Sequence, residues 1–265
     1  MAKFVHSLSG GTHILAGAGG VQMVMLVRNK KETFTDFIAR EAKAQSLSVV
    51  VNGSFIDLTR ATQVLVHLGN SPLDPSDATP TGQVIQEGKL LSGISSPGKF
   101  SFAQDTCGKA RYSAAQGNPP ASACSAIGGI APIVIDDLPY GDRNLYKQGV
   151  PADAPTTGLV GATHLPFLTQ KSNTMFADVL KRGGDVGKTA IGYSNAKQCL
   201  LILSQSHGAA GLDANGIRTV FIGVKVSNAV FLDCSDSATL YFDGKFLVTP
   251  GPVKNEYLTV AVGFK

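Results

Sequence analysis

The chain has 265 residues, of which 43% are hydrophobic and only 16% charged, a balance that excludes an intrinsically disordered protein. A chain of this length can bury a sizeable core, so we expect a single domain over residues 1–265. The net charge of +4 comes without the clustered basic face of a nucleic-acid binder, since Lys30-Lys31 and Lys181-Arg182 are only pairs. Nucleic acid is therefore not an expected partner.

No segment of the sequence has the pattern of a membrane anchor or a secretory signal. Met1–Gly11 lacks a charged start, an apolar run and a cleavage site. The longest apolar stretch, Ile14–Val27, is broken by glycines and is too short to span a bilayer. We expect a soluble, cytoplasmic protein with no membrane partner, and export by a non-classical route is the alternative. The oligomeric state is left open.

The cysteines and histidines show no metal-site or redox spacing. No two of the four cysteines, at positions 107, 124, 199 and 234, have the two-residue spacing of zinc or thioredoxin motifs. We therefore expect four free thiols. In an exported chain, Cys107 and Cys124 would instead pair across a loop rich in Gly, Pro and Ala. The five histidines have no metal-ligand spacing, so no metal or cofactor is expected.

Taken in chain order, the hydrophobic patterns predict many short strands and few helices. The 30 glycines, set among runs rich in Val, Ile and Phe, are typical of turn-rich strand structure. Helical spacing of apolar residues predicts helices at Thr35–Ala44, Ser172–Lys181 and Asp213–Val224. Residues 93–125 are loop-rich and their pattern assigns no element, and residues 138–163 are predicted as a surface loop or lid. Strands are predicted at 14–28 (a hairpin turned at 17–20), 47–51, 61–68, 84–91 (a hairpin), 127–135, 188–193, 198–203, 229–232, 241–247 (a hairpin) and 258–264.

The predicted fold class is α+β, with a mixed, largely antiparallel sheet and few helices. The pattern at Asp213–Val224 suits two structures, because the apolar residues have helical spacing while the β-branched residues also suit a strand. A helix is favoured there because a strand pattern restarts at Ala229.

Two glycine-rich segments fall short of nucleotide-binding motifs. The segment Gly183–Thr189 has Arg182 where a phosphate-binding loop needs its first glycine. Gly17–Gly20 lacks the last glycine of the dinucleotide fingerprint, since Gln22 stands there. Neither segment predicts a nucleotide site.

Four other segments share a single pattern, in which an apolar strand runs into a turn of small residues that presents polar side chains. They are Val49–Asp57, Ile127–Val134, Gly187–Gly192 and Ala229–Leu240. Polar groups at the ends of several strands tend to gather at one site. We therefore expect Asn52, Lys188, Asp233 and Ser237 to converge on one cleft.

In these segments the chain resembles the phosphodiester glycosidase family. The family's Asn-Gly-Gly-Phe-Phe-Asp is similar to Asn52–Asp57, and its Arg-Thr-Ala-Ile-Gly is similar to Lys188–Gly192. Its Leu-Asp-Gly-Gly-Gly-Ser-Ala-Thr is similar to Leu232–Thr239, and its closing basic-Val-x-Asn pattern is echoed by Val253–Asn255. The pieces occur in the family's order over residues 35–265. The resemblance implies a single domain of that type and a hydrolase that cuts the bond between a sugar's anomeric carbon and a phosphate.

The residues kept in these motifs suit that chemistry. A phosphodiester leaves as a stable anion and needs little protonation, so one carboxylate acting as nucleophile or base can suffice. Asp233 is expected to be that carboxylate. Asp57 is the candidate second carboxylate or ligand for sugar hydroxyls, and His207 is the candidate proton carrier.

The remaining candidates bind the substrate, a sugar-1-phosphodiester or a nucleotide-sugar-like molecule. Lys188 and Lys254 would offset the phosphate charge. The side chains of the strand ends would donate to phosphate oxygens or sugar hydroxyls. The expected substrate-binding set is Asn52, Lys188, Ser237, Lys254, Asn255 and Gly129.

Two departures from the family pattern motivate an alternative function. Lys188 stands where the family has arginine, so a planar clamp for phosphate becomes a point charge. Cys234, Ser235 and Asp236 replace three glycines that would let backbone approach a ligand closely. The alternative is a non-catalytic glycan- or nucleotide-sugar-binding module on the same fold. A third hypothesis is a structural protein in which the glycines only form turns, and in which Asn52-Gly53 is a tight turn and not part of a ligand site.

Overall fold

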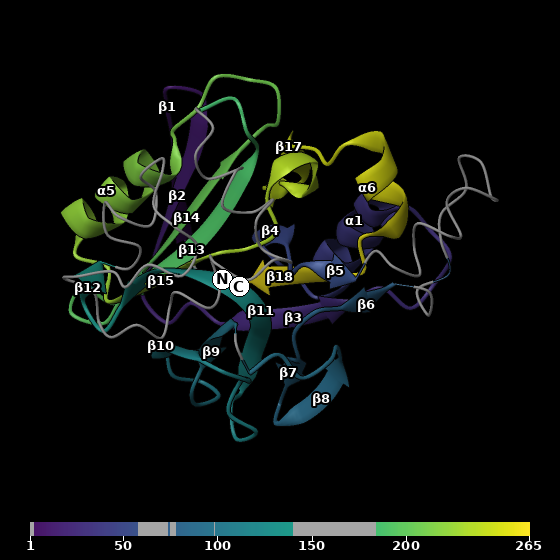
Figure 1. Cartoon of the computed structure of the whole chain (residues 1–265), viewed down its shortest axis with the longest axis horizontal. Helices are drawn as coiled ribbons and strands as arrows, with labels where there is room; N and C mark the ends of the chain where they lie inside the picture. Colours follow the sequence, from purple (N-terminus) through teal and green to yellow (C-terminus); the bar gives the residue numbers. More distant parts are fainter. Residues whose placement is uncertain (1–2, 58–73, 75–77, 98, 140–183) are drawn as a thin grey trace, which may run out of the picture.

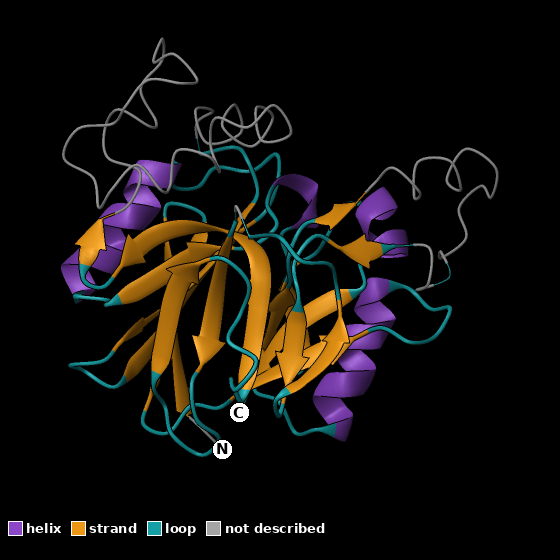
Figure 2. Cartoon of the chain, turned by 60° about the horizontal axis from the view of Figure 1, so that its bottom comes forward, coloured by secondary structure: helices purple, strands orange, loops and turns teal. Residues whose placement is uncertain are grey.

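The computed structural model of the chain describes residues 3–57, 74, 78–97, 99–139 and 184–265. Within these ranges two antiparallel sheets pack face to face in a single domain, with an α-helix on the outer side of each (Figure 1 and Figure 2). The predicted α+β class is confirmed. The predicted strand at 61–68, the helix at 172–181 and nearly all of the loop at 138–163 lie outside the described residues.

The larger sheet has the strand order β1-β2-β14-β13-β15-β11-β7-β8, with β9 and β12 joined to β11 and β10 joined to β9. Its strands are β1 (Lys3–Ser9), β2 (Thr12–Ala18), β7 (Val84–Gln86), β8 (Lys89–Ser92), β9 (Phe100–Gln104), β10 (Tyr112–Gln116), β11 (Ser125–Ile135), β12 (Leu138–Pro139), β13 (Lys188–Ser194), β14 (Cys199–Gln205) and β15 (Asn228–Phe231).

The smaller sheet has the order β17-β16-β4-β18-β3, and two short strands form a separate pair. The smaller sheet contains β3 (Met23–Val27), β4 (Val49–Asn52), β16 (Leu240–Phe242), β17 (Lys245–Val248) and β18 (Val260–Phe264), and the pair is β5 (Ile56–Asp57) and β6 (Thr79–Pro80). The helices of the described part are α1 (Phe34–Ala44), α5 (Ala214–Val224), α6 (Pro252–Tyr257) and the 3-10 turn η4 (Ser235–Ser237).

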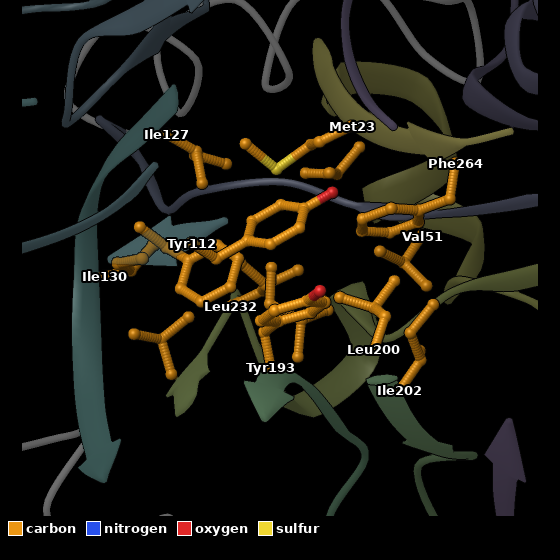
Figure 3. Packing of buried hydrophobic residues seen from close by; sticks show 14 of the residues in the cluster. Met23, Val51, Tyr112, Ile127, Ile130, Tyr193, Leu200, Ile202, Leu232 and Phe264 are labelled. Carbon is orange, nitrogen blue, oxygen red and sulfur yellow. The ribbon is translucent and has the colours of Figure 1, made fainter. Parts of the chain in front are cut away.

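The main core lies between the two sheets and is built by alternate side chains of their strands. In β13, Ile191 and Tyr193 belong to this core, whereas Ala190 contacts the cluster beneath α5. Figure 3 shows the core side chains from both sheets meeting in this layer. The ring centres of Tyr112 and Tyr193 lie 4.6 Å apart. Because both faces of β13 are covered, all seven residues of this strand are buried.

Each large helix starts at a side-chain cap and buries one apolar face against a sheet. The hydroxyl of Thr33 accepts a hydrogen bond from the Asp36 amide at the start of α1. The carboxylate of Asp213 accepts one from the Gly216 amide at the start of α5. The helix predicted at Asp213–Val224 is thus confirmed. The buried contacts of α1 are Phe34, Phe37, Ile38 and Ala42, and those of α5 include Ile217 and Phe221. No helix among the described residues is long and apolar enough to cross a membrane.

The hairpin predicted over 14–28 was wrong in its pairing. The segment predicted as a hairpin over 14–28 instead sends β2 into the larger sheet, beside β1 and β14, and β3 into the smaller sheet, beside β18. Its glycines therefore carry the chain between sheets. The region 93–125, which the sequence left unassigned, contains β9 and β10, whose short Ala- and Ser-rich sequences give a weak strand pattern.

The prediction of four free thiols was also wrong, because Cys107 and Cys124 form a disulfide. Cys107 lies in the connection between β9 and β10, and Cys124 immediately precedes β11. Since β9 pairs with both neighbouring strands and the Cys124 amide donates to the Gln104 carbonyl, the two Cα atoms lie 4.9 Å apart. Pairing through an intervening strand leaves no signature in cysteine spacing.

We expect thiol titration of the unfolded, unreduced protein to find two thiols, those of Cys199 and Cys234. The protein should be produced in an oxidising compartment, and titration after full reduction is the control and should find four. Four thiols before reduction would contradict the disulfide.

Candidate functional site

The chain crosses from the larger sheet to the smaller one in the segment that joins β15 to β16. The Leu232 amide donates to the Thr189 carbonyl of β13, and the next amide, that of Asp233, donates to the Gly53 carbonyl just after β4 (both 2.9 Å). Asp233 therefore lies at the junction of the two sheets, where strand ends from both meet.

The side-chain amide of Asn52, the last residue of β4, fixes this junction. Its nitrogen donates to the Asp233 carbonyl at 2.7 Å. Its oxygen accepts from the Thr189 hydroxyl at 2.7 Å and from the Thr239 amide at 3.0 Å. Asn52 is fully buried, so these bonds are made away from water. In this geometry Asn52 holds the backbone at Asp233 and Thr239 in place. The predicted role of Asn52 as a substrate ligand stays a prediction.

The side chain of Asp233 is a buried carboxylate with a raised pKa. Only 7% of the residue is exposed, and this burial raises the pKa of the carboxyl group to about 6. The positive charge of Lys254, the Ser237 hydroxyl and the Cys234 amide oppose the rise, while Asp236 adds to it. A carboxylate that changes charge near neutrality inside a protein is typical of a functional site.

Lys254, in α6, is the cation that faces this carboxylate. Its ammonium lies 3.9 Å from an oxygen of Asp236 and 5.0 Å from the ring centre of Tyr257. Burial lowers the pKa of Lys254, but the negative charge of Asp233 and the Tyr257 hydroxyl outweigh it, so the pKa is raised overall. The ammonium is held charged beside Asp233.

Lys188, the first residue of β13, is fully buried one position before Thr189. Its ammonium donates to the Val186 carbonyl at 2.9 Å. Burial lowers its pKa, and the negative charges of Asp213 and Asp185 act against this lowering, with the Cys234 side chain a further neighbour. Lys188 therefore lies near the turn that follows Asp233, whereas Lys254 is paired with Asp236 and interacts electrostatically with Asp233.

Two buried hydroxyls of the site lack hydrogen-bond partners among the described residues. The Ser237 hydroxyl makes no hydrogen bond to the described residues, although it lies close enough to Asp233 to lower the pKa of that carboxyl group. The Ser54 hydroxyl follows Gly53 in the turn after β4 and is also unpartnered. Leaving a buried hydroxyl unpaired costs about 1–3 kcal/mol, so such groups in a native protein call for a ligand or water.

The other predicted residues lie at the margin of this junction or serve the fold. His207 is exposed, and its ring accepts a long bond (3.4 Å) from the Gly187 amide, next to Lys188. Asn255 accepts from the Thr35 amide at 2.9 Å and ties α6 to the start of α1. Gly129 has a φ of +73° and lies against the backbone of Gly82, which leaves no room for a Cβ. Asp57 ends β5, and the structure places only its backbone.

The contacts around Asp233 show that Asn52, Asp233, Ser237 and Lys254 come together, with Lys188 beneath them. A cleft at this point stays a prediction. Two open cavities of about 480 and 800 Å³ are lined by other residues, among them Lys109 and Gln198 in the first and Gln22 and Lys265 in the second.

Sequence reasoning missed Lys99 and Ser54. Lys99 belongs to none of the four motifs and lies just before β9, more than 100 residues from Asp233 in the sequence. Its ammonium lies over the ring of Phe55 at 5.4 Å. Ser54 stands at a glycine position of the family motif, and only the folded structure shows its unpartnered hydroxyl.

The turn that replaces the family's glycines keeps a glycine-like backbone. Ser235 has a φ of +64°, the left-handed region that favours glycine. Its amide donates to the Gly187 carbonyl at 2.7 Å, and that glycine has no space for a Cβ. Burial raises the pKa of the neighbouring Cys234 thiol to about 12, so this thiol stays neutral. Ser235 thus adopts a backbone conformation that a glycine at this position would favour.

Comparison with known proteins was made at the levels of sequence and of structure. No known family profile and no curated protein matches the sequence. Among solved structures, the chain is similar to the zebrafish N-acetylglucosamine-1-phosphodiester alpha-N-acetylglucosaminidase catalytic domain auto-inhibited by its pro-peptide. The TM-score is 0.58 at 15% identity, over 99% of this chain and 82% of that one.

Two further solved structures are similar. One is a hypothetical protein from Synechocystis, with a TM-score of 0.50 at 11% identity over 99% of this chain and 61% of that one. The other is a Burkholderia pseudomallei K96243 protein described as exported, with a TM-score of 0.53 at 13% identity over 96% of this chain and 73% of that one. At these identities the likeness is one of fold, and the fold of this chain resembles that of the glycosidase catalytic domain.

Proposed function

We propose that this chain is a phosphodiester glycosidase that hydrolyses the bond between the anomeric carbon of a sugar and a phosphate. The substrate is a sugar-1-phosphodiester or a nucleotide-sugar-like molecule. The observation that carries the proposal is the buried carboxylate of Asp233, which has a pKa of about 6 and faces the ammonium of Lys254. The fold likeness to a catalytic domain named for a sugar-1-phosphodiester supports it.

The chemistry follows from what a phosphate leaving group needs. Ionised Asp233 attacks the anomeric carbon or takes a proton from the attacking water, and the bond from that carbon to the phosphate oxygen breaks. The electron pair leaves with the phosphate, which departs as an anion without prior protonation. The charge of Lys254 stabilises the phosphate as its negative charge grows. No second acid is required, which agrees with a site built around one carboxylate.

The alternative, a binding module without turnover, is favoured by one observation. The turn after Asp233 carries the side chains of Cys234, Ser235 and Asp236 where the family has only hydrogen atoms. A module of this kind would bind sugar-1-phosphodiesters and release them intact. The two functions therefore differ in the products, and one incubation separates them.

We expect incubation with a panel of sugar-1-phosphodiesters and nucleotide sugars, read by mass spectrometry, to yield free sugar and a phosphomonoester or nucleotide. A methyl N-acetylglucosamine-1-phosphodiester is the first compound to test. The matched control is methyl N-acetylglucosaminide, which lacks the phosphate leaving group and should stay intact. Saturable binding with all compounds recovered unchanged would exclude the hydrolase and support the binding module.

The disulfide bears on where this function takes place. Disulfides persist mainly in oxidising compartments, so the Cys107–Cys124 bond favours export over the predicted cytoplasmic location. We propose an exported protein, and this is checked by cell fractionation of the producing organism.

A further inference from the structure

Lys99 approaches the site from an element that carries none of the family motifs. Its backbone is fixed on both sides, since its amide donates to the Ser96 carbonyl and its carbonyl accepts from the Gly117 amide. From there the half-buried side chain extends over the ring of Phe55, with the ammonium 5.4 Å from the ring centre. Phe55 lies two residues after Gly53, whose carbonyl accepts from the Asp233 amide.

The charge of Lys99 interacts electrostatically with the carboxylate of Asp233. Burial lowers the pKa of Lys99, and the charge that opposes this lowering is that of Asp233. A half-buried ammonium near a carboxylate, with no ion pair at contact distance among the described residues, is a cation that an incoming anion can reach. Lys254 approaches the same carboxylate from α6, so two lysines from distant segments flank Asp233.

A second, independent observation points to a ligand between these lysines. The Ser237 hydroxyl is fully buried and close to Asp233, the Ser54 hydroxyl is 2% exposed, and neither makes a hydrogen bond to the part of the chain that the structure describes. Ser54 directly precedes Phe55, the residue whose ring lies under the Lys99 ammonium, so the two residues belong to the same turn after β4. Hydroxyl donors beside ammonium groups are the groups that bind phosphate oxygens.

We propose that Lys99 is a phosphate-binding residue of the site, and that the substrate's phosphate binds between Lys99 and Lys254 with the Ser54 and Ser237 hydroxyls as further donors. This inference rests on the proposed function and assigns the charge that binds the phosphate. Lys99 would then supply part of the charge that was predicted to come from Lys188. The Lys188 ammonium instead donates a hydrogen bond to the Val186 carbonyl.

The test measures the binding of inorganic phosphate to the intact chain by calorimetry. Lys99→Met should weaken phosphate binding roughly tenfold, the loss expected for one charge-assisted contact, whereas Lys99→Arg should retain most of it. The matched control is Lys89→Met, at an exposed lysine of β8, which should bind as the wild type does. Ser54→Ala should weaken phosphate binding without lowering the melting temperature of the free protein, because the Ser54 hydroxyl has no hydrogen-bond partner among the described residues to lose. Ser237→Ala should weaken phosphate binding as well.

The outcomes separate this inference from the proposed function. Phosphate binding that depends on Lys99, in a protein that turns over no sugar phosphodiester, would leave the inference standing and remove the hydrolase. Turnover with the same KM in Lys99→Met and wild type, or equal phosphate affinity in the two, would overturn the inference and leave the hydrolase. Equal loss of phosphate binding in Lys89→Met and Lys99→Met would also overturn it, because the effect would then be one of net charge.

Discussion

Replacing Asp233 by Asn is expected to lower kcat on a cleaved sugar-1-phosphodiester by about 10²–10⁴-fold or more, while the protein stays folded. The substitution keeps the size of the side chain and removes the charge that attacks the sugar or activates water. Because the loss lies in the chemical step, KM should change far less than kcat. Steady-state kinetics with circular dichroism as a folding check measure both. The matched control is Asp243→Asn, an exposed turn aspartate in the β16–β17 hairpin, which should keep full activity.

The same residue gives a pH dependence with opposite signs for activity and stability. Only ionised Asp233 can act as nucleophile or base, so activity should fall as the pH falls through about 6. The folded pKa lies above the unfolded value of about 3.8, so ionisation is disfavoured in the folded state. The cost to stability is absent below about pH 4 and complete above about pH 6, and two pKa units correspond to on the order of 2–3 kcal/mol.

Asp233→Asn should therefore be more stable than wild type at pH 7 and equal to it near pH 4, as measured by urea unfolding. A buried charge kept at a cost in stability is what a catalytic carboxylate requires. An Asp233→Asn protein that retains full turnover would refute the assignment, and Asp57 or Asp236 would become the next candidate.

Replacing Asn52 by Ala is expected to lower the free energy of unfolding by roughly 3–5 kcal/mol. The change leaves the Thr239 amide and the Asp233 carbonyl, both inside the protein, without their partner, and removes the acceptor of the Thr189 hydroxyl. Urea unfolding gives the loss directly. Activity should fall as well, because the segment that holds Asp233 loses its attachment to β4.

The control for Asn52 is Asn118→Ala. The Asn118 side chain also accepts from one amide, that of Ser96, and donates to one group, the Ser95 hydroxyl, but it is exposed. Water replaces its partners, so the cost should be below about 1 kcal/mol. Equal losses in the two variants would show that Asn52 is an ordinary turn residue and that the junction does not depend on it.

Much of the fold could be predicted from the sequence because each strand is locally patterned. The helices at Thr35–Ala44 and Asp213–Val224 and the strand pair β13–β14 follow from spacing and capping residues within a few positions. Strand partners are not local properties. The hairpin predicted over 14–28 failed because its two strands pair with strands that lie far away in the sequence, β2 with β14 and β3 with β18, in different sheets.

The candidate site was predictable only where a motif marks it. Asp233, Ser237 and Lys254 lie in segments that resemble family motifs, and the structure brings them together. Lys99 carries no local pattern, since a lysine before a strand is ordinary, and its place near Asp233 depends on how β9 packs. The Cys107–Cys124 bond was predicted only as the alternative for an exported chain, because it depends on the pairing of β9 with its neighbours.

The central claim, that this chain cuts the bond between the sugar and the phosphate oxygen, is tested most directly by hydrolysis of a sugar-1-phosphodiester in water enriched in oxygen-18. Breaking the carbon–oxygen bond adds the water oxygen to the sugar, so the released phosphomonoester should contain no label by mass spectrometry. One labelled oxygen in that phosphomonoester, or release of the sugar as its 1-phosphate, would show attack at phosphorus and contradict a glycosidase.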